Sequence, residues 1–534
     1  MEFIKVHLGL IGNIGADLSK IGKKRTVQRR LSLPISIFCL IHKDEFVKEY
    51  SIAVSSEIHN TLSGHLIRSD GQEDLCFALW YPSTGHNRTT ALIFKVILPK
   101  KDDRNVHNNA SFNAQYFERA VSEARRLDAG IVFLHSHPSF GWQDMSTDDI
   151  YTESSLAAST KGATGLPLIG MTLGLDGAWS GRFWVKKKSR FYERMWCRNV
   201  RVVGKYMDTT FSEKIAPIPS FKDELNRTIS AWGEVNQAKL SRLVVGVVGC
   251  GSVGSMVAES LARMGVQNLK LFDFDTLQVH NLDRTLNARK KEALLNKAKV
   301  EVVGKSLLNS ATVEGFKVDQ VEYSIAEEKG YRKALDCDVL FSCVDRPLGR
   351  YVLNCIAFAH LIPVIDGGIK VLADSRGLKH ADWRAHIVSP ERVCLECLGQ
   401  FNVAEVQLDR DGHLDDPRYI ENNSDLIHRG SENVFAFSLN VSGLEVLQFL
   451  NYIFRPSKSQ FVGPQIYHFL GGDIEFDTKI CATNCHFPAK LARGDRDVTV
   501  YGRHITAEIA REKRRVLKSQ VKNRIREFIY DVLG

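Results

Sequence analysis

The 534-residue sequence contains no apolar run that approaches the roughly 20 residues of a membrane-spanning helix. The short apolar stretch at residues 6–12 (VHLGLIG) lacks the basic leader that precedes the apolar core of a secretory signal peptide. Internal repeats and low-complexity tracts are also missing, which argues against a repeat protein or a disordered chain. We therefore expect a folded cytoplasmic protein without a membrane partner.

The eleven cysteines follow no disulfide framework, and the chain is much longer than the small secreted domains that depend on disulfides. Free thiols and metal ligands are expected instead. The formal net charge of +9 is concentrated in residues 22–30 and in residues 501–534, which hold nine Lys and Arg against four Asp and Glu. Because the remaining chain is nearly neutral, we expect no nucleic-acid partner. The C-terminal stretch is interpreted as a solvated basic helix, with a docking surface for an acidic partner as the alternative.

A chain of this length is expected to form two or three domains. Residues 1–48 are interpreted as an N-terminal extension with at least one strand, at LPISIFCLI (residues 33–41). Residues 49–192 alternate short apolar runs with helical patterns, which predicts an α+β domain. A mixed linker is expected over residues 193–224, and a basic helical tail over residues 487–534.

Residues 225–486 show the strict alternation of strands and helices that is typical of a doubly wound α/β sheet. Strand-like apolar runs lie at residues 242–251, 269–275, 338–345 and 362–368, and helical patterns lie at residues 252–265, 290–308 and 349–360. The sequence therefore predicts a parallel sheet that the chain enters through a glycine-rich turn.

Two histidines lie at the end of the buried strand expected at GIVFLHSHP (residues 130–138). His135 and His137 are two positions apart, so both imidazoles project to the same side of the strand. Two imidazoles and a carboxylate form an open catalytic zinc site, and Asp149 is the nearest carboxylate that a returning helix would supply. Spacing alone would more often give no metal site, and Ser146 has a structural alternative as the N-cap of that helix.

The complete string resembles the signature of the JAMM (MPN+) metalloproteases, which reads His-Ser/Thr-His-Pro, seven residues, Ser, two residues, Asp. The matching residues are His135, Ser136, His137, Pro138, Ser146 and Asp149. The resemblance covers about residues 50–192 and implies a zinc protease that cleaves after the C-terminal glycine of a ubiquitin-like protein. It further implies a general acid/base glutamate on an early strand, best matched by Glu73, and an oxyanion-holding role for Ser146.

A second site is indicated by GCGSVG, where Gly249, Gly251 and Gly254 lie between a strand and a helix. Backbone N–H groups of such a turn and the helix N-terminus face phosphate groups. An acidic residue about 20 positions further on, here Asp275, would bind ribose hydroxyls. These features alone fit a nicotinamide-dependent dehydrogenase as well as an ATP enzyme.

Additional charged residues favour ATP over a nicotinamide cofactor, because a hydride-transfer site does not require several cations and an extra carboxylate around phosphates. They resemble those of the ubiquitin-activating superfamily, which includes the bacterial sulfur-carrier adenylyltransferases of the ThiF/MoeB type. The resemblance implies that Asp275 holds the ribose and that Asp345 holds Mg²⁺ beside ATP. It assigns phosphate binding to Asn281, Arg284 and Lys299.

The segment before the glycine turn, NRTISAWGEVNQAKL (residues 226–240), looks like the lead-in of the same superfamily. Its Arg227 matches an arginine that reaches into the ATP site of a partner subunit. The resemblance therefore implies a homodimer formed through the adenylation domain.

Two pairs of cysteines predict a closed structural zinc site. Cys394 and Cys397 form a CxxC motif, and Cys481 and Cys485 form a more widely spaced pair. Many members of the superfamily place a zinc ion at this point, usually with two residues inside the second pair. His486, next to Cys485, is an alternative fourth ligand.

Residues 398–480 contain no cysteine, although superfamily members that form a thioester keep one in this segment. The favoured interpretation is a reaction that stops at the acyl-adenylate, which the nucleophile of a conjugating-enzyme-like acceptor then attacks. A relay thiol elsewhere is the alternative. Cys343 and Cys355 are the nearest candidates, but both lie in elements expected to be buried.

The two resemblances together imply a bifunctional enzyme that trims a ubiquitin-like protein and then adenylates its C-terminus, as in bacterial conjugation systems, some of them linked to phage defence. Activation of a sulfur carrier for cofactor biosynthesis is the enzymatic alternative. A non-catalytic scaffold that binds a ubiquitin-like protein is the alternative of another class.

Overall fold

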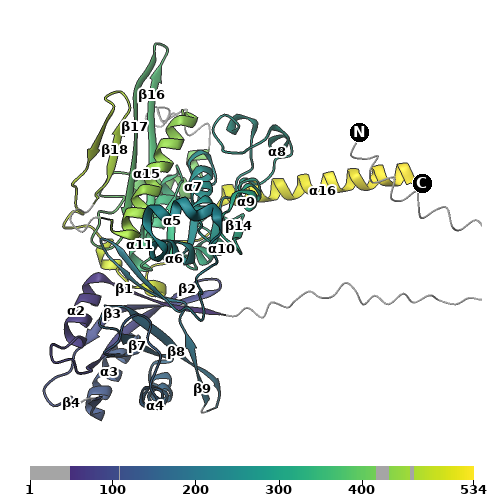
Figure 1. The fold of residues 1–534 in the computed structure, drawn as a ribbon. Coiled ribbons are helices and arrows are strands. Elements are labelled where there is room, and N and C mark those ends of the chain that lie inside the picture. The colour runs from purple at the N-terminus through teal and green to yellow at the C-terminus, as the bar shows by residue number, and fades with distance from the viewer. Residues whose placement is uncertain (1–47, 108, 190, 416–431, 457–461, 534) are drawn as a thin grey trace, which may run out of the picture. The chain divides into compact units, whose positions relative to one another are not determined.

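The computed structural model describes residues 48–107, 109–189, 191–415, 432–456 and 462–533. The expected strand at residues 33–41 and the basic run at residues 22–30 lie outside the described residues. The described chain contains one sheet of nine strands, one sheet of eight strands and a separate two-stranded hairpin (Figure 1).

The nine-stranded sheet is built from the N-terminal part of the described chain. Its strands, in spatial order, are β11 (Met207–Phe211), β10 (Asn199–Val203), β1 (Glu49–Ser55), β3 (Arg88–Ile97), β2 (Leu75–Thr84), β6 (Gly130–Ser136), β7 (Leu168–Leu173), β8 (Trp179–Lys188) and β9 (Phe191–Trp196). Its helices are α2 (Ser56–Leu66), α3 (Ala114–Leu127) and α4 (Thr147–Thr164), and the hairpin comprises β4 (Arg104–His107) and β5 (Asn109–Phe112). Separate hydrophobic cores lie on its two faces, one with α2 and one with α3 and α4.

The structure extends this sheet into the stretch that the sequence analysis treated as a linker, residues 193–224. β10 lies inside the sheet and pairs in parallel with β1, and β11 forms one edge. β10 carries Arg201 in its centre, which interrupts the apolar run by which a buried strand is recognised. The buried guanidinium is tolerated because Asp338 lies beside it, with 3.7 Å between Arg201 Nε and Asp338 Oδ1.

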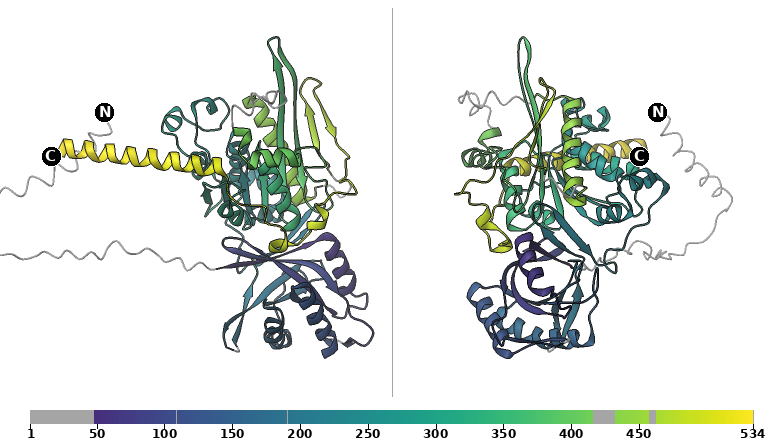
Figure 2. Two further views of the ribbon diagram at one scale, coloured as in Figure 1. Left: turned by 180° about the vertical axis from the view of Figure 1, so that it is seen from behind. Right: turned by 60° about the vertical axis from the view of Figure 1, so that its left-hand side comes forward.

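The eight-stranded sheet is doubly wound over five of its strands. Its spatial order is β14 (Lys317–Val321), β13 (Asn268–Phe272), β12 (Val244–Val248), β15 (Val339–Ser342), β16 (Val364–Asp374), β17 (Gly377–Val388), β18 (Gln465–His468) and β19 (Asp473–Phe476). Pairing is parallel from β14 to β16 and antiparallel from β16 to β19, so the expectation of a parallel sheet holds only for the first five. β16 and β17 form a long hairpin that projects beyond the helices (Figure 2).

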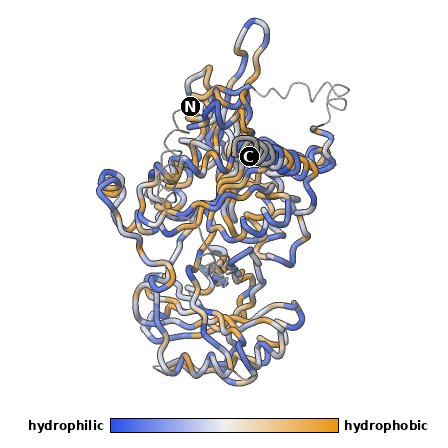
Figure 3. Tube along the Cα trace, turned by 90° about the vertical axis from the view of Figure 1, so that its right-hand side faces the viewer, coloured by the Kyte–Doolittle hydropathy of each residue, from blue (hydrophilic) through white to orange (hydrophobic). Residues whose placement is uncertain are grey.

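Helices cover both faces of this sheet. One core includes α7 (Ser252–Arg263), α9 (Lys299–Ser310) and α15 (Phe435–Phe454), and the other includes α10 (Glu328–Ala334), α11 (Pro347–Ala359) and α12 (Val403–Arg410). The single helix expected over residues 290–308 is interrupted between α8 (Lys290–Leu294) and α9, where Asn296 has a positive φ of 46°. Hydrophobic stretches of the chain gather where the strands pack against these helices (Figure 3).

The remaining helical elements lie before and after the doubly wound sheet or connect its strands. They are α5 (Asn226–Trp232), α6 (Glu234–Arg242), the long α16 (Ile505–Leu533), and the short 3-10 turns Asp223–Leu225, Val279–Asn281, His413–Asp415, Pro488–Lys490 and Gly494–Arg496. The structure thus places a long helix in the basic C-terminal stretch, but the helical tail predicted over residues 487–534 begins only at Ile505, after two 3-10 turns. Among the described residues, no helix is both long and apolar enough to cross a membrane.

The two large sheets share a hydrophobic core. Met207 and Phe211 of β11 belong to the same cluster of buried side chains as Leu240 of α6 and Val245 of β12. The elements that carry the two sequence-predicted sites are therefore packed into one body within residues 48–533.

Candidate functional site

The two strand-end histidines and the helix carboxylate converge as the sequence predicts. His135 Nε2 lies 3.3 Å from Asp149 Oδ1, and His137 Nε2 lies 3.3 Å from Asp149 Oδ2. The Nε2 atoms of the two imidazoles are 3.2 Å apart. His135 lies in β6, His137 directly follows the last residue of that strand, and the first turn of α4 supplies the aspartate.

Asp149 and Ser146 also close the N-terminus of α4. The Ser146 hydroxyl oxygen accepts a hydrogen bond from the Asp149 N–H (3.1 Å), and Asp149 Oδ2 accepts one from the Ser146 N–H (2.8 Å). Burial raises the pKa of Asp149, but the hydrogen bonds from His135 and His137 have the larger combined effect and lower it. The pKa of Asp149 therefore lies well below its usual value. The capping bonds fix the carboxylate in a position where both its oxygens face imidazoles.

Glu73 lies beside this cluster. β2 and β6 are antiparallel with Leu75 opposite His135, and Ser136 N–H donates to the Asp74 carbonyl (3.0 Å), so Glu73 comes opposite His137. Burial raises the pKa of Glu73. The two histidines lower this pKa, and the charge of Asp149 raises it. The strand register is the signal that places this glutamate, and the sequence did not show that register.

A buried polar network lies behind the histidines. Thr172 Oγ1 is 3.3 Å from His135 Nε2 and accepts a hydrogen bond from Arg182 (2.7 Å). Arg182 is paired with Glu153 of α4, whose carboxylate also accepts a hydrogen bond from Trp184 Nε1 (2.6 Å). Sequence analysis did not identify this network, because its members come from three separate elements.

The donor set fits a divalent cation such as zinc. One atom from each of His135, His137 and Asp149 lies within 4.8 Å of the others. Both imidazole Nε2 atoms point at the same carboxylate and at each other, an arrangement that a shared cation satisfies. His135 Nδ1 is buried without a hydrogen-bond partner among the described residues.

The glycine turn leaves open space in which a ligand can approach its backbone closely. Gly249 has a φ of +92°, and a Cβ there would lie 2.5 Å from the Cys343 carbonyl oxygen. A Cβ on Gly254 would lie 1.8 Å from the Gly249 carbonyl oxygen, so both positions require glycine. A Cβ on Gly251 would meet nothing within 4 Å. This open side faces the N-terminus of α7, where Gly251 provides no side-chain cap.

Asp273, which is not among the residues predicted from the sequence, anchors this turn. Its Oδ2 accepts a hydrogen bond from Cys250 N–H (2.7 Å), and its Oδ1 accepts one from Asp275 N–H (2.8 Å). Burial raises the pKa of Asp273, while Lys299 lowers it. The first aspartate of DFD could have been recognised because it follows β13 directly, at the carboxyl edge of the sheet.

Lys299 joins two of the predicted site residues. Its Nζ lies 2.8 Å from Asp275 Oδ2, and the side chain is 15% exposed. Burial lowers the pKa of Lys299, but the carboxylates of Asp273 and Asp275, with a smaller contribution from Asp345, raise it above the usual value. The structure therefore places a mostly buried cation beside the carboxylates of Asp273 and Asp275, next to the glycine turn.

Two other predicted phosphate ligands make local contacts instead. Asn281 Oδ1 accepts a hydrogen bond from Gln278 N–H (3.0 Å), and Arg284 Nη1 donates to the His280 carbonyl (2.7 Å) and to Asp283 (2.9 Å). Their segment is tied to α7 because Leu286 N–H donates to Ser255 Oγ (3.1 Å).

Arg227, on α5, is exposed, as expected for a residue that would act in a partner subunit. Its assigned role remains an expectation.

Cys343 lies against the glycine turn but in surroundings that disfavour a thiolate. Its Sγ is 3.8 Å from Glu445 Oε2. Burial and the neighbouring carboxyl group raise the pKa of the Cys343 thiol, and burial raises the pKa of Glu445. Cys355 is buried in α11, and burial raises its pKa to about 12.

The four cysteines expected to bind a structural zinc ion lie together. Cys394, Cys397, Cys481 and Cys485 each place a sulfur within 4.8 Å of the others. Backbone N–H groups donate to three of these sulfurs. The Cys394 N–H donates to Cys481 Sγ (3.2 Å), the Cys397 N–H to Cys394 Sγ (3.3 Å) and the Ala482 N–H to Cys397 Sγ (3.4 Å). This donor set fits a tetrahedral zinc site. His486 Nδ1 instead lies 3.8 Å from Glu396 Oε2.

The comparisons with known proteins find similarity in the second half of the chain. Residues 224–453 match the model of the ThiF family. The matched residues include β12, the glycine turn and Lys299.

Similar curated proteins include the adenylyltransferase and sulfurtransferase UBA4 of Yarrowia lipolytica, 29% identical over 30% of this chain and 40% of that protein. Ubiquitin-like modifier-activating enzyme 5 of Drosophila mojavensis is 29% identical over 30% of this chain and 41% of that protein. The chain thus spans about two fifths of the length of these relatives. Among solved structures, E. coli MccB with MccA-N7isoASN aligns with a TM-score of 0.41 at 18% identity, over 50% of this chain and 75% of that chain.

Proposed function

We propose that this protein is a bifunctional enzyme that processes the C-terminus of a ubiquitin-like protein and activates it with ATP. The observation that carries the activating function is the cluster of Lys299, Asp273 and Asp275 beside a glycine turn within a ThiF-family domain. The two similar proteins described above bear the names of an adenylyltransferase and a ubiquitin-like modifier-activating enzyme, which supports the same reaction class.

The chemistry requires activation because a free carboxylate is a poor acyl donor. In the proposed step, the C-terminal carboxylate of the ubiquitin-like protein attacks the α-phosphate of ATP, and pyrophosphate leaves. The turn at Gly251 would donate N–H groups to phosphate oxygens, and Asp275 would bind the ribose. Lys299, whose raised pKa keeps it cationic, would stabilise the charge that develops on the phosphates.

The other phosphate and metal ligands are proposed from the resemblance. Asp345 would hold Mg²⁺ with ATP, and Asn281 and Arg284 would bind phosphate after their loop changes its local contacts. Arg227 would enter the ATP site of a second subunit, which makes the active form a homodimer.

Pyrophosphate exchange tests this function. The protein is incubated with ATP, labelled pyrophosphate and a candidate ubiquitin-like protein, and Lys299→Ala is expected to slow exchange at least about a hundredfold, in line with the loss of one transition-state donor. Lys305→Ala, on the same helix, is the matched control and should change exchange less than twofold. Equal rates in the Lys299→Ala variant and wild type would disprove the assignment.

We further propose that the His135 cluster is the active site of a zinc peptidase that cleaves after the C-terminal glycine. The residues that would hold the ion are His135, His137 and Asp149. Zinc held there would supply a Lewis acid that activates water and polarises the scissile carbonyl. Glu73 would accept the proton of the attacking water and deliver it to the leaving amine. The Ser146 hydroxyl accepts the Asp149 N–H and still has its own proton to donate to the oxyanion.

A fusion of a ubiquitin-like protein to a reporter, joined through its C-terminal glycine, tests this activity. Glu73→Gln is expected to lower kcat by at least about a hundredfold, because general acid–base catalysis of this type contributes 10²–10⁴ in rate. Zinc content should stay unchanged in this variant, while Gln72→Ala should cleave at the wild-type rate. Cleavage that survives both Glu73→Gln and Asp149→Asn would refute the proposal.

The proposed setting is a bacterial ubiquitin-like conjugation pathway in which a conjugating-enzyme-like acceptor attacks the adenylate directly. The raised pKa of Cys343 supports the absence of a thioester on this chain. Sulfur-carrier activation remains the second candidate, since one relative is named a sulfurtransferase as well as an adenylyltransferase. A thiocarboxylate on the carrier, rather than a conjugate on other proteins, would establish that candidate.

A further inference from the structure

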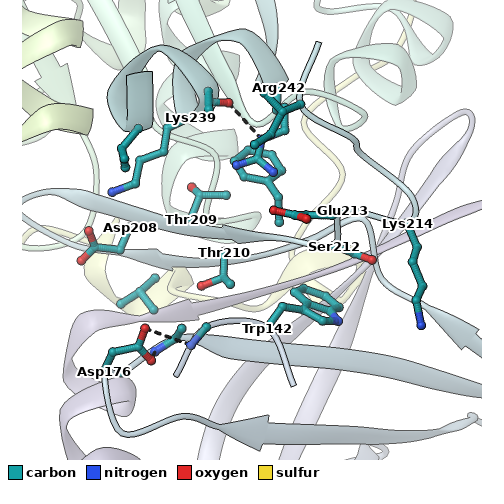
Figure 4. Close-up of a pocket in the computed structure, with 18 of the residues that line it drawn as sticks. Trp142, Asp176, Asp208, Thr209, Thr210, Ser212, Glu213, Lys214, Lys239 and Arg242 are labelled. Carbon is teal, nitrogen blue, oxygen red and sulfur yellow. Dashed lines mark hydrogen bonds between the residues drawn. The ribbon is translucent and has the colours of Figure 1, made fainter. Parts of the chain in front are cut away.

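A cleft of about 820 Å³ lies beside the edge strand β11. Figure 4 shows β11 along its floor, with Thr209 and Thr210 between two walls. Trp142 and Asp176 lie on one wall, and Lys239 of α6 lies on the other. Neither of the two proposed reactions uses this cleft.

The floor of the cleft is an unpaired strand edge. Among the described strands, β11 is the last of the nine-stranded sheet on this side, and β10 is its only sheet partner. Opposite residues of an antiparallel pair exchange hydrogen bonds at every second position. Ser212 N–H donates to the Arg198 carbonyl (3.0 Å), and Gly204 N–H donates to the Tyr206 carbonyl (2.9 Å).

These two bonds fix which residues of β11 face outward. The register continues from Arg198–Ser212 through Val200–Thr210, so Thr210 is bonded to β10. Thr209 and Phe211 therefore present their backbone N–H and C=O groups to the cleft. In the part of the chain that the structure describes, these outward groups have no hydrogen-bond partner, and the buried Thr209 Oγ1 also lacks one.

The walls supply surfaces for side chains of a bound strand. The Trp142 ring packs near Trp196 at a centroid distance of 6.0 Å, and the Arg242 guanidinium lies 4.5 Å from the centroid of the Phe211 ring. Val235 on α6 is 72% exposed. An extended peptide pairs by its backbone and places alternate side chains on the two sides of the new strand, which fits a walled edge of this kind.

We infer that this cleft binds the extended C-terminal tail of the ubiquitin-like substrate as an additional strand on the outer edge of β11. The inference rests on the proposed function and names where that substrate is held. The loop over residues 138–145 connects the wall residue Trp142 to His137 at one end and to Ser146 at the other.

The opposite wall is continuous with the second site. α6 ends at Arg242, and β12 then leads from Val244 directly into Gly249. A tail in the cleft would thus contact the loop next to the first site and the helix that directly precedes the strand leading to the second site. Any extended peptide can pair with β11 through its backbone groups. The test distinguishes the substrate tail from other peptides by its effect on cleavage.

The test uses the full chain and a peptide series of acetylated Val-Thr repeats that ends in Arg-Gly-Gly-aminocoumarin. KM is expected to fall about tenfold as repeats are added, while kcat stays constant, because the added backbone pairs with β11. Thr209→Pro removes one outward N–H and leaves the bonds to β10, a position where an edge strand tolerates proline. This variant should lose the gain from length and cleave the shortest peptide at the wild-type rate.

A second variant and a labelled peptide keep the inference testable if Thr209→Pro misfolds or if no peptide is cleaved. Val235→Trp narrows the cleft from α6 and should weaken binding of the longest fluorescein-labelled peptide about tenfold by anisotropy. Saturation with this peptide should slow amide exchange at Thr209 and Phe211. N-methylation of the peptide on its pairing edge should abolish binding.

Absence of cleavage together with binding at β11 would refute the peptidase proposal and leave this inference supported. Unchanged binding in both variants, or exchange protection that excludes Thr209 and Phe211, would overturn the inference. A length-dependent KM that is identical in the wild type and the Thr209→Pro variant would overturn it as well.

Discussion

Arg88 and Asp338 form a fully buried ion pair between the two sheets, with 2.6 Å between Arg88 Nη1 and Asp338 Oδ1. Arg201 adds a second guanidinium, which donates to the Asp338 carbonyl (2.9 Å). The other carboxylate oxygen of Asp338 accepts a hydrogen bond from Val244 N–H (2.9 Å), at the start of β12. One carboxylate therefore holds the strand that enters the glycine turn and supplies a counter-charge to buried guanidinium groups of the nine-stranded sheet.

Asp338→Asn is expected to destabilise the protein by about 3–5 kcal/mol, because it leaves buried guanidinium groups without a counter-charge. The measurement is the free energy of unfolding from denaturant titration. Glu193→Gln is the matched control, since the Lys187–Glu193 pair is exposed and its loss should cost less than about 1 kcal/mol. A similar small effect for both variants would contradict the role of Asp338.

The lowered pKa of the Asp338 carboxyl group predicts that the free energy of unfolding depends on pH. Burial raises the pKa of Asp338, but Arg88 and Arg201 lower it further, to about 2. A carboxyl group whose folded pKa is lowered contributes stability above its unfolded pKa of about 3.9 and loses it as the pH falls through the folded value. The stability difference between wild type and Asp338→Asn should therefore shrink between about pH 4 and pH 2. A constant difference across that window would rule out this linkage.

Two glycines of the turn should respond differently to alanine. In Gly254→Ala, the new Cβ would lie 1.8 Å from the Gly249 carbonyl oxygen, so both thermal stability and ATP binding should be lost. In Gly251→Ala, the Cβ meets no protein atom within 4 Å, so the melting temperature should stay within about 3 °C while ATP binding weakens. Calorimetric titration of ATP and thermal unfolding check both. Gly443→Ala, also free of neighbours, is the control for helical glycine.

Local patterns predicted much of the fold and of the candidate site. The alternation of apolar strands and helices indicated the doubly wound part of the second sheet, and a short string placed His135, His137 and Asp149 together. Such strings are informative because the strand end and the following helix turn are close in sequence. The cysteine pairs, although distant in sequence, were recognised by ligand type.

Features that depend on tertiary contacts could not be predicted from the sequence. β10 carries a buried arginine that only Asp338 makes acceptable, so the strand resembled a linker. Asp273 anchors the glycine turn through backbone bonds, a role that no spacing rule reveals. Glu73 could be placed securely only through the register of β2 against β6, which sequence does not give.

Metal analysis should distinguish the two candidate metal centres. We expect two zinc ions per chain by elemental analysis, one for each donor cluster. His137→Ala should remove one ion and change the melting temperature little, because its site lies at a strand end next to an exposed loop. Cys397→Ser should remove the other ion and lower the melting temperature strongly, since its cluster joins distant segments. Zinc contents that do not change in either variant would contradict these assignments.

Cys343 should remain unmodified during catalysis. Burial and Glu445 raise the pKa of its thiol, so the reactive thiolate is scarce at neutral pH. Alkylation by iodoacetamide at pH 8 should therefore be at least about tenfold slower than for a free cysteine peptide. Cys343→Ser should retain pyrophosphate exchange within twofold of wild type, because a serine oxygen can occupy the sulfur position beside Glu445. Mass spectrometry of the working enzyme with ATP and its ubiquitin-like protein provides the decisive measurement. A covalent adduct on Cys343 that thiol reagents release would show that the protein transfers its substrate through a thioester after all.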